Sequence, residues 1–542
     1  MLEFNFNILN LKASRTYSWR LFALLILIVI GGFAYGQTKK VKKEKKKKSK
    51  IEILHANDLF FDEENGIKAK RLIGDVRIKY DKTIMTCDSA FVYSSTNSMK
   101  AYSRVHITDK EGGMELFGDS LKYNGETRLT EVRGKVKVIT DDMELSTRFL
   151  DYDRLKDYGY YWNGGVIYLN DNKDTLTSQI GHFYNTTNEI HFKDSVRLRS
   201  EDYNIESDTM HHNTRTERTK FFGPTTITSD ANRIYTEKGW TNNKSGESEF
   251  TKNSFIITDD QQIWGDSILY NQKTDLAEMF CNVTMLDTIN EFIVQGDYVL
   301  HNQKDSTTLV IGMPLMTQIF DDDSLFLHAD TLYSEFDSTR QFRRIRAHRK
   351  AQFYKSDMQG KCDSLVFRDE DSSIVLFYDP ILWSDANQIT ADFIQIFRTE
   401  GRLDRMVMND NAFINSLEDS TVRYTMYNQI KGDSMIGIFD TNALRKVFVR
   451  HSGIAIYWAK EDTSGYIGMN KANAEFMTIL LDSSTVEEII LNQNPTATLY
   501  PIKDITPRMQ YLKKFEWRGK ERPNNREDVY NWREKEAIKE GD

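Results

Sequence analysis

Apolar and polar residues alternate along most of this chain, in short stretches that come in pairs. Residues 117–124 (Phe-Gly-Asp-Ser-Leu-Lys-Tyr-Asn) and residues 134–138 (Gly-Lys-Val-Lys-Val) form the clearest pair. Because successive side chains of a strand point to opposite faces, each stretch has one apolar and one polar face. The intervening Asn124-Gly125-Glu126 tolerates the left-handed backbone of a tight turn. The pattern predicts a strand, a turn and a second strand.

The same pair returns at a nearly constant interval. Residues 264–271 (Trp-Gly-Asp-Ser-Ile-Leu-Tyr-Asn) almost copy the opening at 117–124, and Val283 follows Asp266 by the same 17 residues that separate Val136 from Asp119. Shorter versions of the opening stand at residues 87–90, 296–299, 362–367 and 432–435. Self-similarity at a fixed period indicates stacked supersecondary units, none of which buries its apolar face alone.

These repeats predict an elongated all-β fold of stacked strand-turn-strand units, with a parallel β-helix as the alternative. From Asp330 onward the spacing within a unit lengthens to 21 residues, as between Asp330 and Ala351. We therefore predict two consecutive arrays, over residues 51–310 and 311–500. After Pro501 the sequence becomes charged and aperiodic, which predicts a surface tail over residues 501–542 with a short helix at 526–538.

The N-terminus has the features of an export signal. Three basic residues precede the apolar run at 21–30, and small residues at 34 and 36 precede Gln37. This arrangement is typical of a cleavable signal peptide over residues 1–36. The alternative is an uncleaved membrane anchor, which needs about 20 apolar residues. Either arrangement places the body outside the cytoplasm, in the periplasm, and leaves open an association with the inner or outer membrane.

Charge separates a short basic arm from an acidic body. The Lys-rich linker at 37–50 holds nine Lys and one Glu, so residues 1–50 carry +10. Because the whole chain carries −8, residues 51–542 carry −18. An acidic body excludes a nucleic-acid binder, whose basic surface belongs to the fold. The arm Lys39–Lys50 is either a solvated linker or a contact for an anionic membrane surface, at about 1 kcal/mol per Lys.

No residue pattern in the sequence predicts an enzyme, a cofactor or a metal site. The nucleophile elbow, the His-Glu-x-x-His helix, the phosphate-binding loop and the dinucleotide fingerprint are all missing from the sequence. The three cysteines form no disulfide framework or zinc spacing. Cys87 and Cys362 occupy the repeat position that Gly118 and Gly265 occupy elsewhere, which predicts small residues in a tight space.

For three polar features we prefer a structural interpretation to a role in binding or catalysis. The pair His211-His212 is expected to mark a strand end and not a ligand pair. The run at 321–323 (Asp-Asp-Asp) lacks the spaced oxygens and the Gly of a calcium loop, so we expect a solvated turn. The Asp of each Gly-Asp-Ser opening is expected at a strand start, where its carboxylate accepts backbone N–H groups.

The repeats resemble the OstA-like/LptA family of lipopolysaccharide-export proteins. The resemblance rests on Gly118–Asn124, Gly134–Val138 and Gly265–Asn271, is clearest over residues 51–310 and is fainter over 330–499. It implies an open, twisted β-jellyroll (a folded β-taco) whose apolar lumen holds lipid A acyl chains. It also implies a non-enzymatic bridge component that pairs with other lipopolysaccharide-export β-jellyroll proteins through strand edges. This chain departs from the family in its length and in its Lys-rich arm.

Folding such a sheet along its apolar face would make a lipid-binding groove. Each acyl CH₂ that moves from water into the lining gains about 0.8 kcal/mol. The expected lining residues are Leu121, Tyr123, Val136, Val138, Ile268, Tyr270, Val283, Met285, Leu365 and Phe367. If the sheet closed on itself, the same residues would form an ordinary core. The chain would then be a structural or adhesive β-solenoid without a lipid ligand. A parallel β-helix acting on polysaccharide, with carboxylates clustered on one external face, is a separate alternative.

Overall fold

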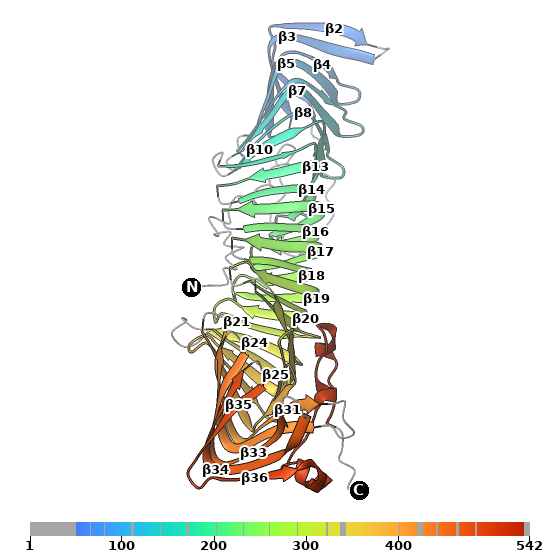
Figure 1. The fold of residues 1–542 in the computed structure, drawn as a ribbon. Coiled ribbons are helices and arrows are strands. Elements are labelled where there is room, and N and C mark those ends of the chain that lie inside the picture. The colour runs from blue at the N-terminus through green and yellow to red at the C-terminus, as the bar shows by residue number, and fades with distance from the viewer. Residues whose placement is uncertain are drawn as a thin grey trace, which may run out of the picture. The chain divides into compact units, whose positions relative to one another are not determined.

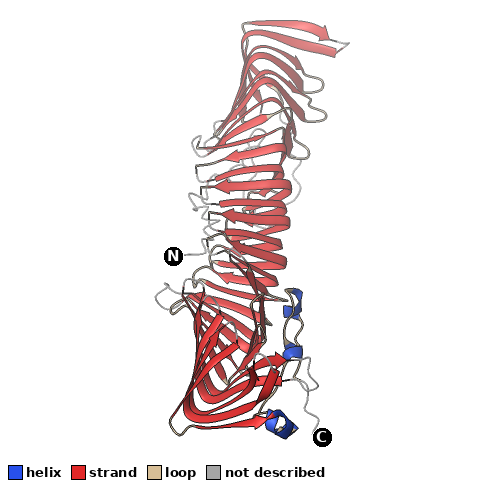
Figure 2. Cartoon of the chain, in the orientation of Figure 1, coloured by secondary structure: helices blue, strands red, loops and turns tan. Residues whose placement is uncertain are grey.

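The computed structural model describes residues 50–535, apart from gaps at 65–66, 81, 110–112, 141–142, 170–172, 202, 231, 260, 290, 321–322, 337–342, 400–401, 420–425, 441–442, 462–464 and 483–484. Within this part of the chain the regular structure consists of β-strands and four short 3₁₀ helices (Figure 2). The expected all-β fold is confirmed. The expected signal peptide at 1–36 and almost all of the Lys-rich linker at 37–50 lie outside the described residues.

The chain folds into two compact units. The N-terminal unit extends to Asp259 and includes Trp264–Asp275, and the C-terminal unit consists of Asp260–Ile263 and the residues from Leu276 onward. The lengthened repeats after Asp330 lie inside the C-terminal unit. Gln261, at the start of β18 (Gln261–Asn271), also belongs to that unit.

The N-terminal unit is built from long strands that follow one another as successive rungs, visible from β13 to β17 (Figure 1). Its strands are β1 (Glu52–His55), β2 (Asp58–Glu64), β3 (Ile67–Tyr80), β4 (Thr83–Tyr93), β5 (Ser98–Asp109), β6 (Met114–Tyr123), β7 (Leu129–Ile139), β8 (Met143–Asp153), β9 (Tyr158–Tyr161), β10 (Gly165–Leu169), β11 (Asp174–Ser178), β12 (Ile180–Tyr184), β13 (Glu189–Arg199), β14 (Tyr203–Asn213), β15 (Arg218–Ser229), β16 (Asn232–Asn242) and β17 (Glu247–Thr258).

The C-terminal unit combines short strands with the long strands β31–β34, and it ends in short helices. Its strands are β19 (Leu276–Asp287), β20 (Phe292–Asn302), β21 (Thr307–Ile311), β22 (Leu315–Ile319), β23 (Ser324–His328), β24 (Thr331–Phe336), β25 (Arg343–Lys355), β26 (Met358–Arg368), β27 (Ser373–Phe377), β28 (Ile381–Ser384), β29 (Asn387–Thr390), β30 (Phe393–Thr399), β31 (Arg402–Asp419), β32 (Met426–Asp440), β33 (Ala443–Glu461), β34 (Gly465–Asp482), β35 (Thr485–Asn492) and β36 (Thr496–Pro501). The helices are η2 (Ile502–Asp504), η3 (Pro507–Gln510), η4 (Gly519–Glu521) and η5 (Glu527–Tyr530).

Strand pairing rules out the parallel β-helix. Neighbours along the chain pair antiparallel, as β4 does with β5, β5 with β6, and β6 with β7. The same holds in the C-terminal unit for β31, β32 and β33. A parallel β-helix would instead stack each strand on its equivalent one coil later. The alternative interpretation of the repeat is therefore wrong.

The predicted hairpin over residues 117–138 is present, and Asn124 organises its turn. β6 and β7 flank the turn at 124–128, where Asn124 N donates to Leu129 O at 2.9 Å. Asn124 Oδ1 accepts the backbone N–H groups of Glu126 and Thr127 at 2.9 and 3.0 Å. Asn213, Asn242 and Asn271 accept in the same way in their own turns. This explains the recurrent Asn at the end of a strand.

The Gly-Asp-Ser motif lies in the middle of a strand, so the expectation of a strand start is wrong. β6 begins at Met114, and Asp119 stands where the pairing of β6 with β7 slips between Phe117 and Ser120. Asp119 Oδ2 accepts the backbone N–H of Lys135 at 3.2 Å, as expected for its chemistry. On the neighbouring strand Gly134 has a φ of +83°. These are the features of a β-bulge, which bends a strand sharply.

The bend recurs on strand after strand and folds each sheet along a line. Ser103-Arg104, Asp194-Ser195, Lys252-Asn253 and Cys281-Asn282 all have positive φ at the same place in their strands. At the bend the alternation changes phase. In β6 Met114 and Leu116 are buried before it, and Leu121 and Tyr123 after it. Both halves of each strand therefore keep their apolar side chains on the inside of the fold.

We call the two sheet halves wall A and wall B. In the N-terminal unit wall A contains residues 76–80, 83–87, 105–109, 114–118, 136–139 and 143–147, and wall B contains residues 67–73, 89–93, 98–102, 120–123, 129–133 and 149–153. In the C-terminal unit wall A includes residues 283–287, 292–296, β22 and β23, and wall B includes β21, β24 and residues 343–348.

A substitution at the bend is expected to destabilise the N-terminal unit. Gly134→Ala would force an L side chain into a left-handed conformation, at about 1–2 kcal/mol, and its methyl group would overlap the Asp119 carboxylate. Gly465→Ala is the matched control, because Gly465 has a φ of +75° and a methyl group added there would meet no other atom within 4 Å. Denaturant unfolding should show a larger decrease in the free energy of unfolding for Gly134→Ala than for Gly465→Ala. Equal losses would contradict the packing role assigned to the bend.

The segment after Pro501 packs against the strands and is not only a surface tail. We call residues 502–535 the C-terminal strap. It lies against β29 and β32 of the C-terminal unit, beside the strands in Figure 1. Gln429 Nε2 donates to Gln510 O at 2.7 Å while its Oε1 accepts Leu512 N at 2.8 Å. Gln388 does the same with Glu516 O and Arg518 N. Each Gln side chain therefore hydrogen-bonds one N–H and one C=O group of the strap backbone, and these groups would otherwise bond to water.

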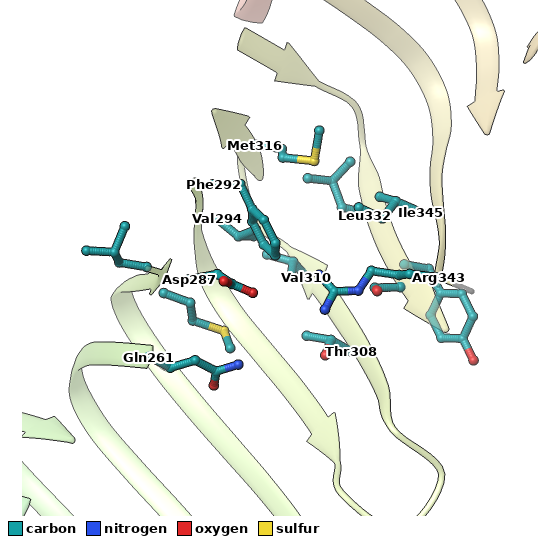
Figure 3. A pocket seen from close by; sticks show the side chains of 14 residues that line it. Gln261, Asp287, Phe292, Val294, Thr308, Val310, Met316, Leu332, Arg343 and Ile345 are labelled. Atoms are coloured by element: carbon teal, nitrogen blue, oxygen red, sulfur yellow. The ribbon is translucent and has the colours of Figure 1, made fainter. Parts of the chain in front are cut away.

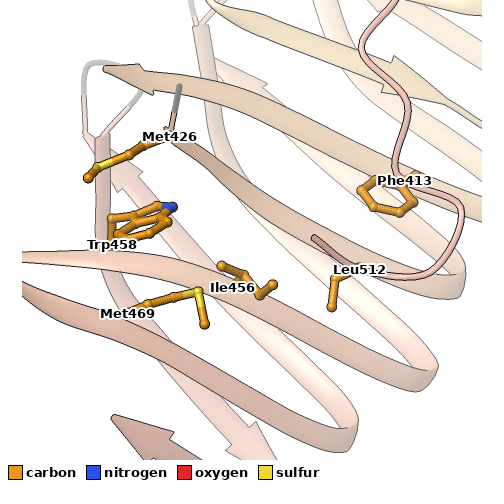
Figure 4. Packing of buried hydrophobic residues seen from close by; sticks show 6 residues of the cluster. All are labelled: Phe413, Met426, Ile456, Trp458, Met469 and Leu512. Carbon is orange, nitrogen blue, oxygen red and sulfur yellow. The ribbon is translucent and has the colours of Figure 1, made fainter. Parts of the chain in front are cut away.

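The strap covers apolar side chains of the neighbouring strands. Leu512 completes a buried cluster with Phe413, Met426, Ile456, Trp458 and Met469 (Figure 4). Tyr427 packs against the rings of Phe515 and Trp517 at 5.1 Å. The helix expected at 526–538 corresponds, in the described residues, to the single turn η5. Trp532 lies over Lys361, with the ammonium 4.0 Å from the ring centre.

Candidate functional site

The space between the two walls contains apolar cavities. One cavity of about 60 Å³ in the N-terminal unit is lined by Leu116, Val138 and Leu145 of wall A and by Val132 and Leu150 of wall B. A neighbouring cavity of about 50 Å³ is lined from both walls as well, by residues that include Ile78, Met85, Met99, Leu121 and Tyr123. About 10–15 Å³ of this volume is needed to hold one water molecule. Each cavity therefore has room for only a few water-sized groups.

All ten residues expected to line a groove are buried in the interior. They are Leu121, Tyr123, Val136, Val138, Ile268, Tyr270, Val283, Met285, Leu365 and Phe367, with exposed fractions of 9% or less. Leu121, Tyr123 and Val138 line the two cavities just described, and Met285 lines a third in the C-terminal unit. The other six are buried as well but do not line these cavities. Burial alone is compatible with both a groove and a closed core.

The open edges of the walls meet at a polar seam in the N-terminal unit. Tyr80, at the end of wall A, lies with its hydroxyl 3.2 Å from that of Tyr123, at the end of wall B. Arg154 Nη1 donates to the Tyr80 hydroxyl at 3.0 Å. Burial, together with Tyr80, raises the pKa of Tyr123 to about 12. Tyr123 is therefore a neutral phenol at physiological pH, and the described contacts of Tyr80 across the seam are ordinary hydrogen bonds.

In the C-terminal unit a cavity of about 40 Å³ lies between the same two walls (Figure 3). Its apolar lining comes from Met285, Phe292 and Met316 of wall A and from Val310 and Leu332 of wall B. Gln261, Asp287, Thr308 and Arg343 add polar groups to the lining. Asp287 ends β19 on wall A and Arg343 begins β25 on wall B, so two opposite charges border the cavity from opposing walls.

Two histidines also face the interior. His212 in β14 and His301 in β20 are 3% and 0% exposed. Their Nδ1 atoms lie 3.0 Å from Thr219 Oγ1 and 2.9 Å from Thr308 Oγ1. Burial lowers the pKa of His212 to about 3 and that of His301 to about 4. Both are therefore neutral at physiological pH.

Acidification is expected to destabilise both units. The folded-state pKa values lie below the ordinary 6.5, so the unfolded chain binds protons first and each histidine's contribution is lost as pH falls below 6.5. At pH 5 the loss is about 2 kcal/mol per histidine, from 1.36 kcal/mol per pKa unit. Thermal unfolding between pH 8 and pH 5 tests this. The double variant His212→Gln/His301→Gln should lose less stability over that range, and an unchanged pH dependence would contradict the assignment.

His211 and His212 do not act as a pair. They are neighbours in β14, so their side chains lie on opposite faces of the sheet. His212 is buried, while His211 stacks on His191 at 3.6 Å on the outer face. Both belong to β14, and His212 lies one residue before its end, as the sequence indicated.

The described residues contain no group of three or more His, Cys, Asp or Glu side chains that could hold a metal ion. Of the run at 321–323 only Asp323 is described, and it accepts the Ser356 backbone N–H at 3.0 Å. Cys87 and Cys362 are buried thiols whose pKa is raised by burial, to about 11 for Cys87. Such thiols are poor nucleophiles. Among the described residues no helix is long and apolar enough to cross a membrane.

Sequence reasoning missed the polar residues at the edges of the walls. Their signal was present, because each falls in the apolar phase of its strand. Asp287 continues the series of Val283 and Met285, and Arg343 begins the series of Ile345 and Ala347. A charged residue at a strand end, at a position where the alternation calls for an apolar residue, is thus expected to face the interior near the open edges of the walls.

Comparison with known proteins supports the resemblance drawn from the repeats. Residues 48–208 match the model of the family described as OstA-like protein. Among solved structures, one match is LptH of Pseudomonas aeruginosa, described as the LptA homologous periplasmic component of the conserved lipopolysaccharide transport device. It is 14% identical, with a TM-score of 0.18, over 19% of this chain and 76% of that chain. A comparison with curated proteins found no match.

Proposed function

We propose that this chain, which is OstA-like over residues 48–208, is a non-enzymatic periplasmic carrier or bridge component for lipopolysaccharide. In this proposal the acyl chains lie between wall A and wall B. The observation that carries it is the apolar interior, which both walls line in the N-terminal and the C-terminal unit. A lipid with several acyl chains needs such an apolar environment to cross an aqueous space. Each CH₂ group that is buried there gains about 0.8 kcal/mol of transfer free energy.

Entry of an acyl chain requires the walls to part. The cavities of about 40–60 Å³ are too small for a whole chain. In the N-terminal unit the described contacts across the seam include hydrogen bonds of Tyr80 to Tyr123 and Arg154. Each such bond contributes only about 0.5–1.5 kcal/mol. Burial of several CH₂ groups exceeds that cost.

The first strands of the chain offer a place for a partner. β2 pairs with β3, and it exposes Leu59, Phe60 and Phe61, the last at 83%. At the other end β36 pairs with β34 and exposes Leu499. Strand edges with exposed apolar residues suit the addition of another strand. The proposed partners are other lipopolysaccharide-export β-jellyroll proteins, with Lys39–Lys50 as a contact for an anionic membrane surface.

A structural or adhesive β-solenoid is the second candidate. The small size of the cavities favours it, because a well-packed interior needs no ligand.

Lipid extraction separates the two candidates. The full chain is purified from the periplasm of producing cells without detergent, and bound lipid is identified by native mass spectrometry. The carrier predicts stoichiometric lipid A-type acyl chains. A protein free of lipid that also fails to take up added lipopolysaccharide would contradict the carrier and leave the solenoid.

A further inference from the structure

The C-terminal cavity combines an apolar lining with a buried guanidinium. Arg343 is only 7% exposed, and Asp287 only 2%. Figure 3 shows the Arg343 side chain reaching into the cavity toward the side that holds Asp287. Its Cζ lies 5.2 Å from the ring centre of Phe292 and 5.3 Å from that of Phe336. The cation is therefore held in place beside two aromatic rings.

The local electrostatics keep this arginine charged against the cost of its burial. Burial lowers the pKa of Arg343, and the carboxylates of Asp287 and Asp369 oppose that effect. Asp369 also accepts the Arg343 backbone N–H at 3.2 Å. A buried ion pair is weak evidence for stability, because well-packed apolar residues often do as well. A guanidinium in the apolar phase of a strand, facing an apolar cavity, therefore suggests a binding role.

Resting on the proposed function, we propose that Arg343 binds the phosphate head group of a lipid whose acyl chain occupies this cavity. Asp287 is then the resident carboxylate that the phosphate replaces as partner of Arg343. The acyl chain lies against Met285, Val310, Met316, Leu332 and Ile345, all of which line the cavity. The head group lies at the strand ends, where β19 stops and β25 starts.

The charges favour a phosphate over the carboxylate that it replaces. A phosphomonoester carries about −1.5 to −2 charges at pH 7, against −1 for Asp287. The planar guanidinium donates two parallel N–H groups to such an anion. Asp287 keeps a hydrogen bond in either state, because its Oδ1 accepts the backbone N–H of Ile289 at 3.1 Å. The exchange therefore leaves no buried carboxylate without a donor.

The test uses the full chain and two lipids with identical acyl chains. One is phosphatidic acid and the other is the matching uncharged diacylglycerol, and each dissociation constant is measured by native mass spectrometry. Arg343→Gln should weaken the binding of phosphatidic acid at least tenfold, which is the loss expected for a charge-assisted hydrogen bond. It should weaken the binding of diacylglycerol less than twofold. Asp287→Asn should tighten phosphatidic acid, since it removes the competing carboxylate.

Arg398→Gln is the matched control. Arg398 is another arginine of the C-terminal unit whose pKa is lowered by burial, and it lies over Phe367 without lining the cavity. Its replacement should leave the preference for phosphatidic acid intact. Inorganic phosphate at the same concentration should not displace phosphatidic acid, because it lacks the acyl chain.

Three results would overturn the head-group site. Arg343→Gln could weaken both lipids equally, Asp287→Asn could weaken phosphatidic acid, or phosphate alone could compete fully. The first two would make the pair a structural contact between the walls, and the third would make the site one for a free anion. Failure of the wild-type chain to bind either lipid would instead contradict the proposed function itself.

Discussion

Replacing Glu521 with alanine is expected to destabilise the C-terminal unit by about 3–5 kcal/mol, the cost of breaking a buried ion pair. Glu521 Oε2 is 2.5 Å from Lys361 Nζ, and Oε1 is 2.7 Å from Arg518 Nε. The side chains of all three are at least 93% buried. Burial alone would raise the pKa of Glu521, yet the hydrogen bonds from Arg518 and Lys361 hold it below its ordinary value. Removing this carboxylate takes from two buried cations the partner that they share.

The measurement is denaturant unfolding followed by tryptophan fluorescence. Trp383 and Trp458 are buried in the C-terminal unit, and Trp458 belongs to the cluster that Leu512 of the strap completes. Glu527→Ala is the matched control, because Glu527 is an exposed glutamate of the same strap, and it should change the stability by less than about 0.5 kcal/mol. Similar small changes for both variants would show that the strap is not held by this ion cluster.

Filling the N-terminal cavity is expected to abolish most acyl-chain binding while the fold survives. Val138→Phe adds apolar bulk to a cavity of about 60 Å³, so the stability should change by no more than the 1–3 kcal/mol typical of overpacking. If two CH₂ groups of an acyl chain can no longer be buried there, the binding free energy weakens by about 1.6 kcal/mol. That is roughly a tenfold rise in the dissociation constant.

The matched control for this variant is Lys137→Phe on the same strand. Lys137 points outward, where its Nζ pairs with Glu144 Oε2 at 2.8 Å. The substitution adds the same ring to the outer face, so binding of a fluorescent fatty acid should remain unchanged. If both variants bind as well as the wild type while Val138→Phe is folded, the cavity does not hold acyl chains.

The hairpins of this fold were predictable from sequence because the turn and its flanking alternation are local. Asn124 and the alternation around Leu121 and Val138 are enough to place β6, its turn and β7. The bend at Asp119 was not, because it reverses the phase of alternation within one strand. A phase reversal at Gly-Asp looks like the start of a new strand unless the neighbouring strand, with Gly134 opposite, is considered at the same time.

The interior was predictable, but its charged edges and the strap were not. Leu121 and Ile268 are buried as their alternation requires. Asp287 and Arg343 come near the same cavity from strands 56 residues apart, and only the folding of the sheet along the bend brings them together. The strap has no period of its own. Among the described contacts, its backbone is bound by the side-chain amides of Gln388 and Gln429 and not by a neighbouring strand. Its sequence therefore does not need to alternate between apolar and polar residues.

Site-specific photo-crosslinking in living cells tests the central claim most directly. A photoreactive side chain is placed at Leu121 and at Val138, which face the interior, and at their neighbours Lys122 and Lys137, which face outward. The account predicts covalent lipid adducts at residues 121 and 138 and none at residues 122 and 137. No adduct at any position, or equal adducts on both faces, would contradict an interior that shelters acyl chains.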